Sequence, residues 1–170
     1  MKKIASSFIA VALLLTTAQG AIAAETTNPY GASTVDPAGP SEVIFTVSKA
    51  GKKVSYTSGQ LSKLKTSTIS IYEPFLKKRQ SFTVIPMKDL FAKVGISGND
   101  KVSTNALNDY IYTNTASQFI SAGGYIAIKR NGTDIPYDQG GPIRIVFGDK
   151  SKWAKNLDAW NWSLASISVK

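Results

Sequence analysis

The sequence predicts a single α+β domain that is mostly β-strand, with short helices between the strands. About eight or nine short segments are β-branched or alternate in the strand period, whereas only about two or three have the apolar spacing of an amphipathic helix. Residues 24–170, which follow a predicted signal peptide at 1–23, have a length that suits one domain. The Pro-, Gly-, Ser- and Thr-rich part at 24–40 is expected to be a flexible leader, so the folded domain is assigned to 41–170.

The first 23 residues have the order of a secretory signal peptide. Lys2 and Lys3 precede an uncharged apolar run at 4–15, and small residues lead to an A-x-A cleavage site at 21–23. The strongly apolar core is well under the roughly 20 residues that a membrane span needs, so we expect cleavage and no stable membrane insertion. No cysteine follows that could carry a lipid anchor. The expected location is therefore periplasmic or secreted.

Local patterns place the elements of the domain. The turn Ala50-Gly51-Lys52 joins two β-branched strands, Ser58 can cap a short helix, and Asn131-Gly132 is the strongest hairpin turn. Pro86 suits the first turn of an amphipathic helix, and Gly95 ends it. The expected elements, in order, are strands at 42–48 and 54–56, a helix at 57–64, strands at 66–72 and 81–85, a helix at 86–94, strands at 102–104 and 110–113, a helix at 115–122, and strands at 125–129, 143–147 and 163–169.

The composition is basic, with 20 Lys and Arg against 11 Asp and Glu and a net charge of +9. Lys2 and Lys3 leave with the signal peptide, so the remaining chain has 18 basic and 11 acidic residues and a net charge of +7. The lysines are scattered, and only Lys77-Lys78-Arg79 forms a tight cluster, which favours a soluble basic surface over a dedicated patch. We do not expect nucleic acid as a partner, because no reader motif is present.

The chain contains no cysteine and no histidine. Although exported proteins have access to disulfides, this one must be stabilised by buried apolar surface. The two absences also remove the commonest zinc, copper and haem ligands and the ordinary Ser-His and Cys-His nucleophile systems. A large part of catalytic chemistry is therefore excluded.

The densest run of specific residues is YDQGGPIRIVF at 137–147. Two glycines and a proline fix a close approach of the backbone just before a strand, and Arg144 stands one strand period after Pro142. A guanidinium on such a rigid edge is well suited to bind a phosphate or carboxylate through two donors. The alternative is an arginine that hydrogen-bonds nearby carbonyls and holds a loop in place.

This run, together with LDAWNWSLASI at 157–167, resembles the closing half of the molybdopterin-binding oxidoreductase domain of sulfite oxidases. In that family a G-x-P-x-R strand is followed by a stretch that ends in tryptophan and by a short terminal strand. Residues 81–90, a strand that runs into a proline-started helix, are similar to an earlier element of the family. The resemblance covers roughly 43–170, and its specific parts are 140–147 and 160–167.

The resemblance implies a compact α+β fold whose loops bind a pterin pyrophosphate, with Gln139 and Arg144 as direct contacts. The cofactor-binding candidates in and beside the specific blocks are Gln139, Gly140, Gly141, Arg144, Asp158 and Trp160. Catalytic members hold molybdenum through a cysteine thiolate, which this chain lacks. Oxygen ligands such as Asp109, Glu73 or Ser81 are conceivable, although nothing in their spacing marks them as ligands. We therefore expect no metal ligand, no catalytic residue and no cofactor. If a cofactor is bound, the resemblance implies that it is molybdopterin.

Several aromatic residues permit two interpretations. Tyr110 and Tyr112 alternate on an expected strand, which favours sheet packing over a stacking platform. Trp160 and Trp162 are expected to share a strand face, where they either line a cleft or cap the core. The segment 73–79 is either a mobile basic loop over a cleft or a solvated hairpin tip.

Three functions follow from these patterns. The favoured one is an exported binding or accessory module that lacks metal-based catalysis and takes a small anionic or aromatic ligand. The second is a divergent molybdopterin-dependent oxidoreductase with a non-thiolate metal site. The third is a secreted protein that binds an anionic polymer or a protein partner through its basic surface.

Overall fold

The computed structural model describes residues 37–169, so the expected signal peptide at 1–23 and residues 24–36 of the expected leader lie outside the described residues. The described part is mostly β-strand with a few short helices, which confirms the predicted α+β class. Its elements are β1 (Phe45–Lys49), β2 (Lys52–Tyr56), α1 (Ser58–Ser62), β3 (Ser67–Glu73), β4 (Lys78–Pro86), α2 (Met87–Val94), β5 (Lys101–Ala106), β6 (Ile111–Thr115), α3 (Ala116–Ser121), β7 (Gly124–Arg130), β8 (Thr133–Asp134), the 3₁₀ helix η1 (Tyr137–Gln139), β9 (Arg144–Phe147), the 3₁₀ helix η2 (Leu157–Ala159) and β10 (Leu164–Val169).

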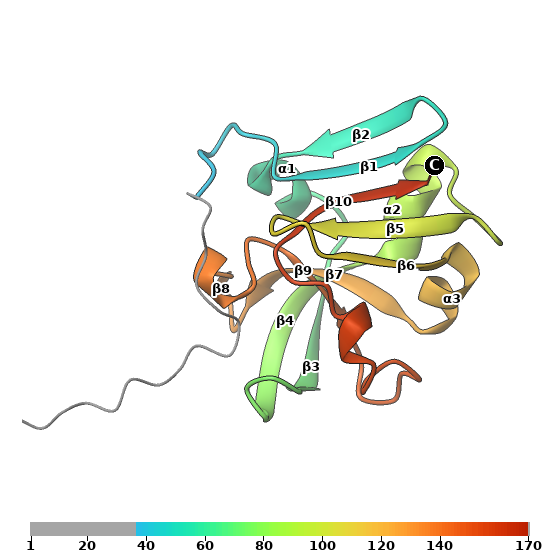
Figure 1. Ribbon diagram of the computed structural model, residues 1–170. Helices are drawn as coiled ribbons and strands as arrows, with labels where there is room; N and C mark the ends of the chain where they lie inside the picture. Colours follow the sequence, from blue (N-terminus) through green and yellow to red (C-terminus); the bar gives the residue numbers. More distant parts are fainter. Residues whose placement is uncertain (1–36, 170) are drawn as a thin grey trace, which may run out of the picture.

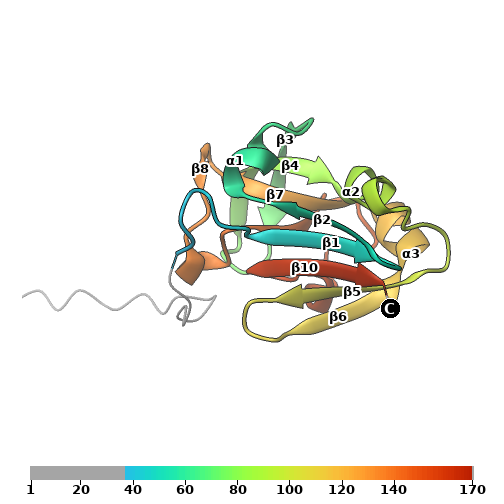
Figure 2. The same cartoon turned by 90° about the horizontal axis from the view of Figure 1, so that it is seen from above.

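The strands form two sheets, which Figures 1 and 2 show from two directions. The first sheet has the order β2-β1-β10-β5-β6, and all its pairs are antiparallel except β1 with β10. The second has the order β3-β4-β7-β8, with β9 beside β7 as well. Strand β10 therefore lies in the middle of the first sheet. Residues 159–161, which come shortly before it, are buried.

Turn chemistry sets the two tight hairpins, as predicted. Ala50 and Gly51 connect β1 to β2 with positive φ values of 46° and 81°, and Asn131 and Gly132 connect β7 to β8 with 52° and 83°. Two successive positive φ values match the twist of antiparallel strands, and glycine and asparagine adopt them at low cost. Gly95 ends α2 in the left-handed conformation, with φ of 79°, as the sequence indicated.

Four details differ from the sequence predictions. Thr57, and not Ser58, caps α1, because Thr57 and Gln60 form a reciprocal capping box. Strand β4 begins at Lys78, so part of the basic cluster belongs to the strand and not to a loop. Trp160 and Trp162 do not share a strand face, since they follow η2 and precede β10. The short elements β8, η1 and η2 were not predicted.

The core lies between the two sheets, and α2 and α3 lie together at one end of the molecule (Figures 1 and 2). Helix α2 contacts strands of both sheets, because its apolar stripe is completely buried. Tyr112 on β6 packs edge-on against Phe119 and Trp153, with ring centres 5.9 and 5.8 Å apart, so this tyrosine serves sheet packing. Among the described residues, none of the helices is long and apolar enough to cross a membrane.

Candidate ligand-binding site

Arg144, the first residue of β9, is completely buried and paired with a buried carboxylate. Both Arg144 and Glu73 have 0% of their side chains exposed, and Nη2 of the arginine lies 3.0 Å from Oε1 of the glutamate. The guanidinium carbon also lies 5.3 to 6.0 Å from the centres of three aromatic rings, those of Phe75, Phe82 and Trp162. The space around this cation is thus filled by side chains of the protein itself.

Glu73 also fixes the tip of the β3–β4 hairpin. Its Oε2 accepts hydrogen bonds from the backbone N–H groups of Phe75 and Leu76, at 3.1 and 2.6 Å. The turned tip places the Phe75 ring edge-on against Trp162, with ring centres 3.9 Å apart. The segment 73–79 is therefore a docked hairpin tip, with its acidic residue buried and its aromatic residue packed inward.

Asp149 holds the two strands of the same hairpin next to its tip, where Tyr72 pairs with Arg79. Asp149 accepts a hydrogen bond from the Tyr72 backbone N–H at 2.7 Å and pairs with the Arg79 guanidinium at 2.7 Å. The Tyr72 hydrogen bond and then the Arg79 contact lower the pKa of Asp149 below its ordinary value.

A carboxyl titration by nuclear magnetic resonance is therefore expected to place the pKa of Asp149 below the ordinary value of an aspartate. Because the folded pKa is lowered, the stability from Asp149 is present above its unfolded pKa and is lost as pH falls through the folded pKa. Arg79→Gln is expected to raise the pKa of Asp149 towards its ordinary value. An Asp149 that titrates at or above that value would contradict the contacts described.

The glycine pair before β9 allows two chain segments to approach closely. Gly140 has φ of 82°, and a Cβ atom there would lie 3.3 Å from Cβ of Trp162. At Gly141 an added Cβ would lie 1.9 Å from the Ile135 carbonyl oxygen. Gln139 accepts a hydrogen bond from the Arg130 guanidinium. These three predicted site residues thus build the loop before β9, where they lie against other parts of the protein.

Asp158 and Trp160, the remaining predicted site residues, lie at an open hollow that we call the aromatic cleft. The cleft has a volume of about 300 Å³. Its lining residues are Phe75, Asn108, Tyr110, Leu157, Asp158, Trp160, Asn161 and Trp162. Trp160 is fixed by a 3.0 Å hydrogen bond from its indole Nε1 to the Trp153 carbonyl, so the inner wall is rigid. Tyr110 and Leu157 remain 41% and 47% exposed, so the outer wall is open to solvent.

Two polar features accompany the aromatic walls. The Tyr110 hydroxyl donates to the Asp158 carbonyl at 3.0 Å, and burial, followed by the nearby Asp158 carboxylate, raises the pKa of Tyr110. Asn161 is buried and donates through Nδ2 to the carbonyl and hydroxyl oxygens of Thr104, at 2.8 and 3.1 Å. Within residues 37–169, its Oδ1 accepts no hydrogen bond. A buried acceptor without a donor is uncommon, and a water molecule or a ligand group that reaches it would satisfy it.

The structure therefore divides the predicted site. Asp158 and Trp160 come together at the cleft, Gln139, Gly140 and Gly141 form the neighbouring loop, and Arg144 is buried in an ion pair. Sequence reasoning did not select Phe75 or Asn161, and it assigned Tyr110 to sheet packing. An aromatic ring at a hairpin tip, where solvated turns prefer small polar residues, was the available indication for Phe75.

The surroundings of Arg144 do not fit the pterin pyrophosphate that the resemblance implied. The guanidinium is enclosed and already neutralised by Glu73, whose carboxylate would repel a phosphate. Of the possible oxygen ligands, Glu73 is already engaged, because its carboxylate binds Arg144 and the backbone of the hairpin tip. Across residues 37–169, no three His, Cys, Asp or Glu side chains gather as metal ligands would.

No protein-family model matches this chain, and no curated protein matches it significantly. Among solved structures, it is similar to the sulfane dehydrogenase SoxCD from Paracoccus pantotrophus, with a TM-score of 0.60 and 11% sequence identity. The match covers 79% of this chain and 39% of that chain, so this chain spans about two fifths of that enzyme subunit. At this identity the likeness shows the fold alone, and it supports the fold that the sequence resemblance implied.

Proposed function

We propose that this protein is an exported, non-catalytic binding module that holds one small ring-shaped ligand in the aromatic cleft. One observation carries the proposal. Four of the eight residues that line the cleft are aromatic, namely Phe75, Tyr110, Trp160 and Trp162, and the hollow opens to solvent. Ligand pockets are mostly apolar concavities with a few polar groups that fix orientation, and this cleft has both components.

The polar groups of the cleft favour a ring that donates hydrogen bonds and carries no negative charge. Asn161 Oδ1 is an acceptor without a donor in the described chain, and Asp158 adds a carboxylate at the rim. An anion would be repelled by Asp158 and would leave the Asn161 oxygen unsatisfied. Of the two ligand classes expected from the sequence, the aromatic one is therefore the better match.

The side chains of this protein favour binding over catalysis. The whole chain lacks cysteine and histidine, and its buried arginine is occupied by Glu73. The rival proposal, a divergent oxidoreductase with oxygen ligands, makes a different prediction for protein recovered from its own cells. Stoichiometric molybdenum or tungsten in that material would favour the rival and overturn a purely binding role.

The cleft can be tested by following tryptophan fluorescence, because Trp160 and Trp162 line it. Titration with adenine, N-acetylglucosamine and benzoate compares a neutral aromatic ring, a neutral sugar ring and an anionic aromatic ring. We expect saturable binding of adenine, with the sugar weaker and benzoate weakest. Tyr110→Ala is expected to weaken adenine binding about threefold to tenfold, because an aromatic contact contributes roughly 0.5–1.5 kcal/mol beyond its buried area.

Tyr72→Ala is the matched control, since Tyr72 is also an exposed tyrosine but does not line the cleft. Its affinities should equal those of the unchanged protein. The proposal would be overturned if no ring compound bound saturably, or if benzoate bound best. Binding to an anionic polymer through the basic surface would instead weaken steeply as salt is added, whereas stacking in the cleft would change little.

A further inference from the structure

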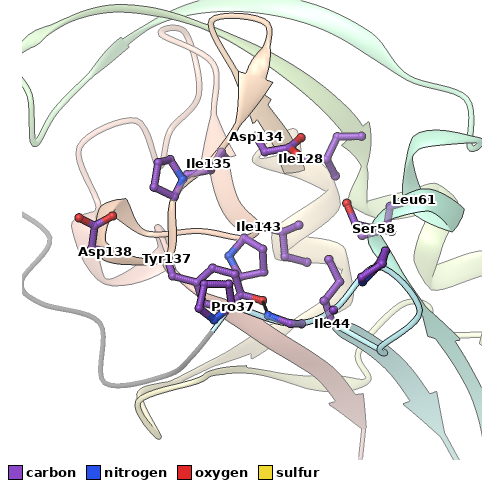
Figure 3. Close-up of a pocket in the computed structure, with 16 residues that line it drawn as sticks. Pro37, Ile44, Ser58, Leu61, Ile128, Asp134, Ile135, Tyr137, Asp138 and Ile143 are labelled. Carbon is purple, nitrogen blue, oxygen red and sulfur yellow. Dashed lines mark hydrogen bonds between the residues drawn. The ribbon is translucent and has the colours of Figure 1, made fainter.

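A second and larger hollow, which we call the apolar groove, lies on the side of the molecule where η1 and α1 face each other (Figure 3). Its volume is about 810 Å³, within the usual range for sites that enclose a drug-sized molecule. The walls are mostly aliphatic and come from several elements. Among the aliphatic lining residues, Ile44 is partly exposed, whereas Leu61, Ile128, Ile135 and Ile143 are buried and offer only a small part of their surface to the groove. The groove shares no lining residue with the aromatic cleft, so the two sites can be tested separately.

The walls of the groove are held in place before any ligand arrives. The Ala38 N–H donates to the Tyr137 hydroxyl at 2.9 Å, which ties the segment before β1 to η1. The Gly39 N–H donates to Glu42 at 2.7 Å and turns the same segment. Pro136 and three further prolines in the lining have a fixed φ, which limits the conformations of the wall. A preformed site loses less conformational entropy on binding than a flexible one.

The charge of the groove is opposite to that of the molecule. The chain has 20 Lys and Arg against 11 Asp and Glu, yet the lining includes Asp134 and Asp138 and no lysine or arginine. Figure 3 shows the Asp134 carboxylate at the rim beside Ile128. Lys129 lies 3.8 Å from Asp134, but both side chains are exposed, and such a pair is weak in water. Asp134 is thus accessible to a cation that enters the groove.

We infer that the apolar groove binds a small organic cation with an apolar body, such as an alkylamine or arylamine. The ammonium group would lie at the rim beside Asp134, and the apolar body would lie along the isoleucine walls. Apolar area buried in the groove supplies affinity, and the Asp134 carboxylate at its rim selects the sign of the charge. The net positive charge of the protein would attract an anion non-specifically, so a preference for the cation can come only from this local arrangement.

The test compares three probes with the same apolar body, octylammonium, octanol and octanoate, below their micelle concentrations. Binding is followed by the methyl resonances of Ile44, Ile128 and Ile143, which report on the groove and not on the aromatic cleft. Octylammonium is expected to bind most tightly and octanoate least. Asp134→Asn should weaken octylammonium binding about threefold to fivefold and leave octanol unchanged.

Asp109→Asn is the matched control, because it removes the same charge from a residue outside the groove and asparagine also accepts the positive φ found there. Its affinity for octylammonium should be unchanged. Equal effects of the two substitutions, tighter binding of octanoate, or no shifts at the isoleucine methyls would each overturn the proposal. Self-association of the chain that shifts these methyls without any probe would assign the groove to a second copy and would also overturn it.

Discussion

Arg144→Met is expected to lower the free energy of unfolding by about 3–5 kcal/mol, because it leaves the Glu73 carboxylate buried without its cation. This is a large fraction of the roughly 5–15 kcal/mol that stabilises a typical domain. The guanidinium also contacts three aromatic rings, so packing is lost together with charge. Chemical unfolding followed by tryptophan fluorescence measures the loss.

The double variant Arg144→Met with Glu73→Gln separates the ion pair from other contributions. The amide oxygen of glutamine can still accept from the backbone N–H groups at the hairpin tip, where Glu73 accepts two hydrogen bonds. No buried charge is left, so the double variant should be clearly more stable than Arg144→Met alone. Glu73→Gln alone should be destabilising, since it leaves the arginine without its anion.

A nearly neutral Arg144→Met would contradict this account of the ion pair. In that case Arg144 would contribute little to stability, and the first interpretation of the sequence, an arginine that binds an external phosphate or carboxylate, would regain support. The unchanged protein and the variants can be compared for pyrophosphate binding under the same conditions. We expect no saturable pyrophosphate binding to the unchanged protein, because Glu73 already neutralises the guanidinium.

Gly141→Ala is the second substitution with a large expected effect. The new Cβ would lie 1.9 Å from the carbonyl oxygen and 2.6 Å from the carbonyl carbon of Ile135, both backbone atoms. Backbone on both sides must move, which would disturb the loop before β9 and the close approach of Gly140 to Trp162. We expect a loss of about 3–5 kcal/mol or failure to fold, in the range of the most damaging point substitutions.

Gly59→Ala makes the same chemical change where there is space. Gly59 lies within α1, and an added Cβ meets only the Thr57 hydroxyl oxygen at 3.9 Å. Alanine favours a helix over glycine by roughly 0.5–1 kcal/mol, so this variant should be slightly more stable than the unchanged protein. Thermal unfolding of both variants checks the pair, and similar stabilities would show that the approach at Gly141 is not as close as described.

The elements that local chemistry determines could be predicted from the sequence. The Ala50-Gly51 and Asn131-Gly132 turns and helix α2 with Gly95 at its end all depend on residues next to one another in the chain. The cap of α1 was assigned one residue late because two adjacent hydroxyl residues, Thr57 and Ser58, both suit the position. The distinguishing feature was Gln60, which completes the box with Thr57 only.

The candidate site could be predicted only in part, since its contacts join distant segments. Arg144 was selected as a residue that binds an anionic cofactor, but its partner Glu73 is 71 residues away, and a single sequence gives no measure of that proximity. The contact of Phe75 with Trp162 is of the same kind. Whether an arginine faces a ligand or an internal carboxylate depends on how two hairpins pack, which no local pattern records.

The central position of β10 has a consequence for how the molecule comes together. The β1–β2 and β5–β6 hairpins can each form from neighbouring residues, but they become one sheet only when β10 enters between them. Until then both hairpins expose unpaired backbone groups towards the gap, which would favour aggregation. The insertion of β10 is therefore expected to be a late step of folding. It depends on contacts between residues far apart in the sequence, and topologies of this kind fold slowly.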